Sequence, residues 1–242
     1  MTILKQIDRE LKQHIDQGYK AGSIRYFKEK IKVIGVRSKI VNKISQKYWK
    51  NLSTEVSQDG GGSKLEIFNL CEQLLKTGYS EKISIALDWT FRLKKDFEKS
   101  DFKIFTSWLS KYISNWASDD DLCTHPLGYL IYKFPEFLPQ LQKLTKSKNR
   151  WERRASAVTF IYPIRYDKKF LPHVFKTAKI LLQDQDDLVQ KGYGWMLKVA
   201  SQKFPADVLK FINQHKSKMP RTALRYAIEK YPQRIRREIL KN

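Results

Sequence analysis

The sequence predicts an all-α fold, an α-solenoid of HEAT-like helical repeats that forms a curved superhelix. The chain holds 10 glycines and 8 prolines among 242 residues, which is less turn-forming sequence than globular domains usually carry. Strand-type alternation bounded by Asn-Gly or Asp-Gly turns is scarce, and apolar residues recur instead every three or four positions. A helix pair with two joints spans about 35–40 residues, the size of one HEAT-like unit.

The predicted helices follow this apolar period in order along the chain. Leu65, Phe68, Cys71, Leu74 and Leu75 illustrate it, since these side chains lie on one helical face. The same period covers residues 3–15, 83–91, 105–113, 155–161, 174–181, 188–199 and 224–228. It is interrupted at residues 133–139, 147–150, 162–167, 184–187 and 218–220. We therefore expect helices of about 11–18 residues with short joints.

The chain is predicted to form one domain over residues 1–242. Its only linker-like stretch, 58–63, reads Gln-Asp-Gly-Gly-Gly-Ser and joins two periodic segments. No run of eighteen apolar residues exists and the first residues include acids, so we expect no membrane span and no secretory signal, hence a cytoplasmic protein located with the chromosome. Two cysteines and four scattered histidines predict no disulfide framework, metal or cofactor. Without a heptad seam, a monomer is expected.

The charge of the chain is strongly positive and unevenly spread. Lys and Arg number 47 against 25 Asp and Glu, which gives a net charge of +22. Residues 1–50 carry +9, residues 51–121 carry −3 and residues 122–242 carry +16. In a curved solenoid both basic blocks can face one concave groove that attracts a polyanion. Zinc fingers, RNP-type aromatic motifs and zippers are absent from the sequence, which favours recognition of nucleic-acid backbone or shape.

Three residues are spaced by about one repeat. Trp116, Arg154 and Trp195 follow one another at intervals of 38 and 41 residues. In a two-helix repeat of that period, equivalent positions line one face, so these side chains are expected to converge on a common groove. Asp120 lies four residues after Trp116 and adjoins it if that segment is helical.

An ordered set of segments carries a family resemblance over most of the chain. The set comprises Ile34-Gly35-Val36-Arg37, Asn115-Trp116 with Asp120, Arg150-Trp151-Glu152-Arg153-Arg154-Ala155, Lys191 with Gly194-Trp195, and Met219-Pro220-Arg221 with Ala223-Leu224-Arg225-Tyr226-Ala227. In these segments the sequence resembles the AlkD family of DNA alkylation-repair glycosylases, which are built from HEAT-like repeats. The resemblance implies excision of cationic N3- and N7-alkylated purines from duplex DNA, without metal or cofactor and without extrusion of the base. It also implies functional roles for Trp116, Asp120, Arg154 and Trp195.

The residue types at these positions suit that chemistry. An N3- or N7-alkylpurine is already a cation and leaves readily, while the deoxyribose acquires oxocarbenium character. A carboxylate stabilises this charge and positions water, so Asp120 is the candidate for both tasks. The electron-rich indoles of Trp116 and Trp195 attract cations. Phosphate contacts are expected from cationic side chains: Arg154, Arg153, Arg37, Lys191, Arg221 and Arg225.

Alternative interpretations remain at each position. The two tryptophans are also typical of core residues, and Asp119-Asp120-Asp121 is also typical of a solvated helix N-cap, which leaves open which carboxylate faces the groove. Arg153 can replace Arg154 at the phosphate. Asn115 and Ala117 flank Trp116 where some relatives carry an aromatic or an acid, so the range of lesions is open. At the level of function, the alternatives are a non-catalytic HEAT-repeat protein that binds damaged, bent or branched DNA through its phosphates, a protein-interaction scaffold, and a generally basic surface.

Overall fold

The computed structural model describes residues 1–58 and 63–241, and over these ranges the regular structure is helical apart from an isolated bridge between Lys32 and Tyr79. The all-α prediction is confirmed. Most of the predicted glycine-rich joint, residues 59–62, lies outside the described residues. The chain divides into two compact units, unit 1 over residues 1–121 and unit 2 over residues 122–242. A single domain over 1–242 with a concave groove stays a prediction.

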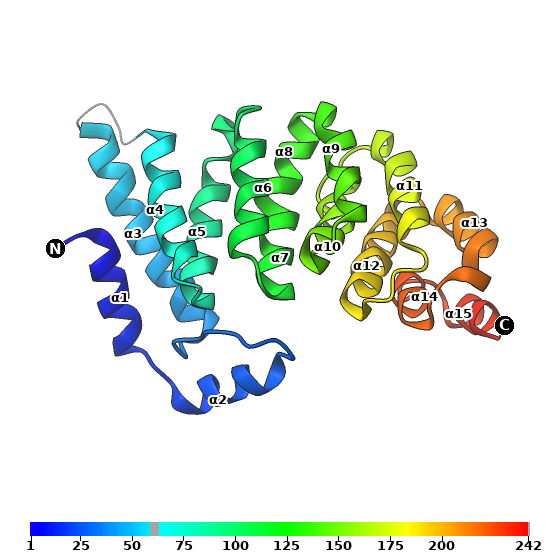
Figure 1. The fold of residues 1–242 in the computed structure, drawn as a ribbon, viewed down its shortest axis with the longest axis horizontal. Coiled ribbons are helices and arrows are strands. Elements are labelled where there is room, and N and C mark those ends of the chain that lie inside the picture. The colour runs from blue at the N-terminus through cyan, green and yellow to red at the C-terminus, as the bar shows by residue number, and fades with distance from the viewer. Residues whose placement is uncertain (59–62, 242) are drawn as a thin grey trace. The chain divides into compact units, whose positions relative to one another are not determined.

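Unit 1 is a row of amphipathic helices with one helix set apart (Figure 1). Its helices are α1 (Ile3–Gln13), α2 (Gln17–Tyr26), α3 (Ser38–Gln58), α4 (Lys64–Lys76), α5 (Ser80–Arg92), α6 (Asp101–Tyr112) and α7 (Trp116–Leu122), the last of which ends one residue into unit 2. Phe68 of α4 packs edge-on against Phe105 and Trp108 of α6, with ring centroids 5.7 and 5.8 Å apart. Trp89 of α5 is fully buried and donates its indole N–H to the Ser45 carbonyl of α3. These contacts fix the helices that carry the site.

Helix α2 lies apart from this row and contains no buried residue. Polar contacts attach it. Asp16 caps its first turn by accepting the Tyr19 amide at 2.9 Å, and the Asp16 amide donates to the Gly35 carbonyl at 2.8 Å. Gly35 adopts a φ of +106°, where a Cβ would lie 2.7 Å from Lys20 Cβ, so only glycine allows this close approach. The Tyr19 amide and then Arg37 hold the pKa of Asp16 below its usual value.

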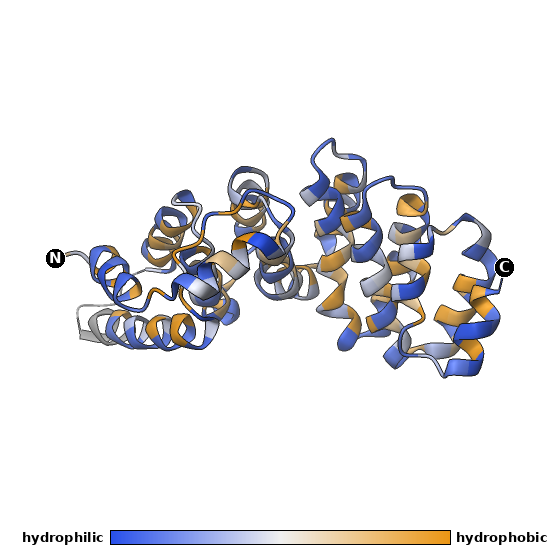
Figure 2. Cartoon of the chain, turned by 90° about the horizontal axis from the view of Figure 1, so that it is seen from below, coloured by the Kyte–Doolittle hydropathy of each residue, from blue (hydrophilic) through white to orange (hydrophobic). Residues whose placement is uncertain are grey.

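Unit 2 is also built from helices. They are α8 (Gly128–Lys133), α9 (Leu138–Lys143), α10 (Arg150–Val158), α11 (Leu171–Leu181), α12 (Asp187–Lys203), α13 (Pro205–His215), α14 (Arg221–Ala227) and α15 (Gln233–Leu240). Polar and apolar residues share most of these helices, as Figure 2 shows. Among the described residues, no helix is both long and apolar enough to cross a membrane.

The predicted joints agree with several helix starts, but the predicted lengths are partly wrong. Helices α10, α12 and α14 begin at Arg150, Asp187 and Arg221, next to the expected breaks. Helices α8, α9 and α14 span only six, six and seven residues. Pro126 lies in a π-helical turn before α8, and Pro135 opens a 3-10 turn before α9. Each proline lacks an amide proton, so the backbone hydrogen-bond ladder cannot run through it.

A matched pair of glycine substitutions tests the packing of α12 against α14. A Cβ at Gly194 would lie 2.7 Å from both the Ala223 carbonyl oxygen and Tyr226 Cβ, whereas a Cβ at Gly22 of α2 would meet nothing within 4 Å. We expect Gly194→Ala to destabilise the protein by about 1–3 kcal/mol, because α14 must shift. Gly22→Ala should be neutral or stabilise by up to about 1 kcal/mol. Urea denaturation measures both, and equal effects would contradict the packing account.

Candidate functional site

The predicted pair Trp116 and Asp120 lies on helix α7 of unit 1. Asn115 is 4% exposed and its Oδ1 accepts the amides of Ala117 and Ser118, each at 3.0 Å, which starts the helix at Trp116. The segment is therefore helical, as the i, i+4 argument required, and Trp116 and Asp120 are one turn apart. Both side chains are half-buried.

Trp116 is held by two aromatic residues that the sequence analysis did not single out. Its indole stacks on Phe27 with centroids 5.1 Å apart and planes 17° apart, and Tyr26 meets it edge-on at 5.9 Å. Trp116 is half-buried and its neighbour Tyr26 is 72% exposed, whereas Trp108, a core residue, is 2% exposed. The core interpretation therefore does not fit Trp116. The sequence signal was an aromatic pair between two cations, Arg25 and Lys28.

The three aspartates of α7 occupy different environments. Asp119 is fully buried, while Asp120 and Asp121 are partly exposed. Asp121 lines a cavity next to Glu81 and Tyr19, and Asp120 does not line it. Because Asn115 caps the helix and the triplet lies within it, the N-cap interpretation is wrong. Asp120 is the partly exposed carboxylate one turn from Trp116.

A cavity of about 330 Å³ lies between α2, α5, α7 and the extended segment before α3. Phe27 lines it together with Tyr19 of α2, Ser118 and Asp121 of α7, and Glu81 of α5. Among the described residues that line it, none is Lys, Arg or His. In a chain of net charge +22 this cavity is therefore a poor place for a phosphate.

Glu81 fixes the backbone segment that carries the predicted DNA contact Arg37. It is 6% exposed, and its carboxylate accepts the amides of Ile34, Gly35 and Val36 at 2.9, 2.7 and 3.1 Å. Arg37 then projects toward α2. Its guanidinium donates to Asp16 at 2.8 Å and lies 5.5 Å from the centroid of the Tyr19 ring. The Arg37 side chain is 63% exposed, so it stays accessible to a phosphate.

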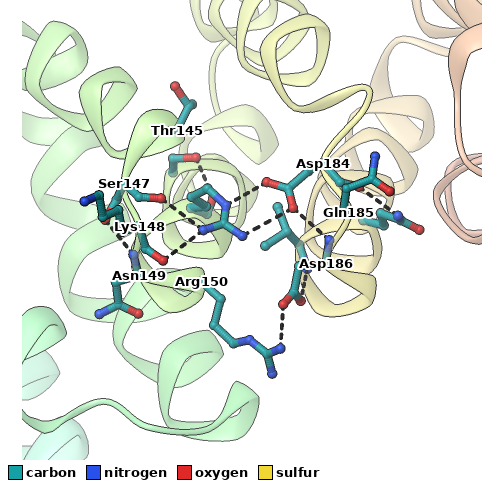
Figure 3. A network of polar contacts seen from close by, with 12 residues as sticks. Thr145, Ser147, Lys148, Asn149, Arg150, Asp184, Gln185 and Asp186 are labelled. Carbon is teal, nitrogen blue, oxygen red and sulfur yellow. Dashed lines mark hydrogen bonds and ion pairs between the residues drawn. The ribbon is translucent and has the colours of Figure 1, made fainter.

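The basic block of α10 in unit 2 is tied to acids before and at the start of α12 (Figure 3). Arg153 donates through Nε to Asp184 at 2.7 Å and through Nη1 to the Ser147 carbonyl at 3.0 Å. Arg150 pairs with Asp186 at 2.7 Å and is 46% exposed. Asp186 in turn caps α12 by accepting the Leu188 amide. The ion pair with Asp184 gives Arg153 a structural role. Arg150, which was not among the predicted DNA contacts, is more exposed than Arg153.

Arg154 lies deeper, at the contact between α10 and α12. It is 5% exposed and its Nη1 donates to the Leu188 carbonyl. Lys191, one turn along α12, pairs with Asp187 at 2.7 Å, and this hydrogen bond raises the pKa of Lys191. A Cβ at Gly192, the residue after Lys191, would lie 3.1 Å from Arg154 Cγ, so Arg154 packs against this part of α12. Trp195 follows Lys191 by four residues and is half-buried.

The remaining predicted cations lie on α14. Arg221 is exposed and donates to the Leu240 carbonyl at 2.9 Å, and Arg225 is exposed next to Tyr226. Within unit 1 the structure thus brings Trp116 close to Asp120, and within unit 2 it brings Arg154 close to Lys191. The convergence of Trp116, Asp120, Arg154 and Trp195 on one groove stays a prediction.

A sequence model of the DNA alkylation repair enzyme family matches residues 7–231. The chain belongs to this family. The match spans both units, and it confirms the resemblance drawn from the ordered segments. A comparison with curated proteins gave no match.

Two solved structures resemble this member of the DNA alkylation repair enzyme family in fold. One is described as a predicted DNA alkylation repair enzyme from Enterococcus faecalis, with a TM-score of 0.77, 16% identity, and coverage of 91% of this chain and 98% of that one. The other is the crystal structure of smu.31 from Streptococcus mutans UA159, with a TM-score of 0.57, 19% identity, and coverage of 80% and 97%. At these identities the likeness concerns the fold.

Membership in the family connects the protein to repair of alkylated DNA. The aromatic group of Tyr26, Phe27 and Trp116 and the neighbouring Asp120 present π faces and a carboxylate, which stabilise positive charge. Unit 2 carries 25 Lys and Arg against 9 Asp and Glu, a balance that suits contact with phosphates. The two units of this family member thus differ in the charge and chemistry of their side chains.

Proposed function

We propose that this member of the DNA alkylation repair enzyme family is a monofunctional DNA glycosylase that hydrolyses the N-glycosidic bond of N7- and N3-alkylated purines in duplex DNA. The observation that supports it most is the pair on α7: Asp120 one turn from an indole that Phe27 holds in place. The alkylated purine is already a good leaving group, so little acid catalysis is needed, and the resemblance to the family implies a reaction without metal and without base extrusion.

In the proposed reaction the bond between C1′ of the deoxyribose and the purine nitrogen breaks, and its electron pair goes to the purine. The purine loses its positive charge and leaves as the neutral base. The sugar becomes an oxocarbenium ion, which the Asp120 carboxylate stabilises. Water adds to C1′ and gives its proton to Asp120, from which it passes to solvent. The products are the free alkylated base and an abasic site in an intact strand.

The other predicted residues serve binding. The indole face of Trp116, and that of Trp195 by the same argument, stabilises cationic sugar or base by about 0.5–2 kcal/mol. Lys191 contacts the phosphates near the lesion, with Arg37, Arg221 and Arg225 along the backbone. Arg154, which is 5% exposed, reaches a phosphate once its guanidinium leaves the Leu188 carbonyl, and Arg153 once it leaves Asp184. Arg150 joins this set because it is 46% exposed on the same helix as Arg154. This binding is electrostatic and should weaken steeply as the salt concentration rises.

Release of free base decides between catalysis and binding alone. Purified protein is incubated with duplex DNA that carries N7-methylguanine, and the free base is quantified by liquid chromatography and mass spectrometry. We expect release well above spontaneous depurination, with the strand intact until alkali is added. Binding to the duplex without release above that background would refute the glycosylase and leave the non-catalytic DNA-binding protein.

A further inference from the structure

A second aromatic surface lies in unit 2 and takes no part in the proposed excision. Its four members, called here the tyrosine patch, are Tyr129, Tyr132, Tyr162 and Tyr166. Tyr129 and Tyr132 belong to α8, and Tyr162 and Tyr166 flank the 3-10 turn Pro163–Arg165 between α10 and α11. The rings of Tyr162 and Tyr166 are 5.0 Å apart, those of Tyr132 and Tyr166 are 5.6 Å apart, and those of Tyr129 and Tyr162 are 5.7 Å apart.

One side of the patch packs against the core, and the other side is exposed to solvent. Tyr132 rests 6.2 Å from the ring of Phe170, which is fully buried. Tyr166 is 61% exposed, and the other three rings are half-buried. Burial, and then the hydrogen bond between Tyr162 and Tyr166, raises the pKa of Tyr162 to about 12, so this phenol is neutral at physiological pH. An exposed ring over a fixed aromatic base is what a stacking ligand needs.

Cations surround these rings. Arg165 ends that turn, and Lys168 and Lys169 lie in the next one, Lys168–Phe170; all three are exposed. The Lys169 ammonium lies 6.0 Å from the centroid of the Tyr132 ring. Lys168 pairs with Asp207 at 3.2 Å and Lys169 with Asp167 at 3.1 Å. Both pairs are about half exposed, and exposed pairs are weak enough for a phosphate to displace the acid.

We propose that the tyrosine patch binds unpaired bases of a single-stranded nucleic acid, with Tyr166 stacking on a base and Arg165, Lys168 and Lys169 holding the flanking phosphates. Proteins usually bind single strands with aromatic rings that stack on the bases and with basic side chains that follow the phosphate backbone. A protein partner fits less well, since lysine is depleted at protein interfaces. Bases within an intact duplex are already stacked on one another, so their faces are closed to Tyr166. This inference is independent of the proposed glycosylase reaction.

Fluorescence anisotropy with a labelled oligo-dT strand and with a blunt duplex of equal length tests the proposal in the full chain. We expect Tyr166→Ala to weaken binding of the strand by about five- to 150-fold, the cost of losing one base–aromatic stack. Tyr166→Phe keeps the ring and should bind within about twofold of the wild type. Tyr79→Ala removes a 37% exposed tyrosine of unit 1 and serves as the matched control.

Two results would overturn the proposal. One is unchanged affinity of Tyr166→Ala for the strand, which would favour a protein partner or no partner at this surface. The other is an equal loss of affinity for the strand and the blunt duplex, since this would assign Tyr166 to duplex binding. Release of alkylated base by Tyr166→Ala should equal that of the wild type, so failure of this proposal and failure of the glycosylase assignment are distinguishable.

Discussion

Asp120→Asn is expected to lower the rate of alkylated-base release by about 100- to 1000-fold, the usual effect of removing one group that stabilises transition-state charge. The amide has nearly the size of the carboxylate and carries no charge. Asp120 is partly exposed, so the fold should survive the change. Affinity for undamaged duplex should stay the same or rise slightly, because a negative charge near the phosphates is lost. Single-turnover release of N7-methylguanine measures the first effect and anisotropy the second.

Asp121→Asn is the matched control. Asp121 is also partly exposed and also lies on α7, but it lines the cavity beside Glu81 and Tyr19. Its conversion to asparagine should leave release within a few-fold of the wild type. Loss of release in Asp121→Asn with retention in Asp120→Asn would assign catalysis to the neighbouring carboxylate. Wild-type rates of release in both variants would show that neither Asp120 nor Asp121 takes part in catalysis.

Glu81→Ala is expected to destabilise the protein by about 3 kcal/mol or more. The change leaves the amides of Ile34, Gly35 and Val36 without their acceptor, and each buried orphan donor costs about 1–3 kcal/mol. Urea denaturation followed by circular dichroism measures the loss. Base release should fall as well, since the same backbone segment carries Arg37 and contacts α2.

Glu81→Gln separates the lost hydrogen bonds from the lost side chain. Glutamine keeps one oxygen acceptor and the full length of the chain, so it should recover part of the stability that Glu81→Ala loses. A stability of Glu81→Ala equal to the wild type would show that water satisfies the three amides and that Glu81 has no structural task.

The helical framework followed from the sequence because most of its helices are amphipathic. Apolar residues at 3.6-residue spacing marked α4, α5 and α6, and these helices bury the predicted faces. Helix α2 was not among the predicted periodic segments, because it buries nothing and its residues show no apolar face. The short helices α8 and α9 were not predicted for a different reason. Prolines interrupt this stretch, so each helix is too short to show a repeated apolar spacing.

The candidate site was partly predictable. Spacing placed Asp120 one turn from Trp116, and the helix of α7 confirms that placement. Spacing gave no indication of Phe27, which lies far away in the sequence and reaches Trp116 only through the fold. The ion pair between Arg153 and Asp184 could not be predicted from the sequence either, because pairing across 31 residues depends on how α10 packs near the start of α12.

The ion pairs of unit 2 affect the expected affinity of the protein for DNA. Arg150, Arg153 and Lys191 already have carboxylate partners near the start of α12. A cation that exchanges one anion for another releases fewer counterions than a bare cation does. The salt dependence of DNA affinity should therefore reflect fewer phosphate contacts than the number of lysines and arginines suggests. Under the proposed function, we therefore expect short contacts with undamaged duplex rather than tight retention at any one position.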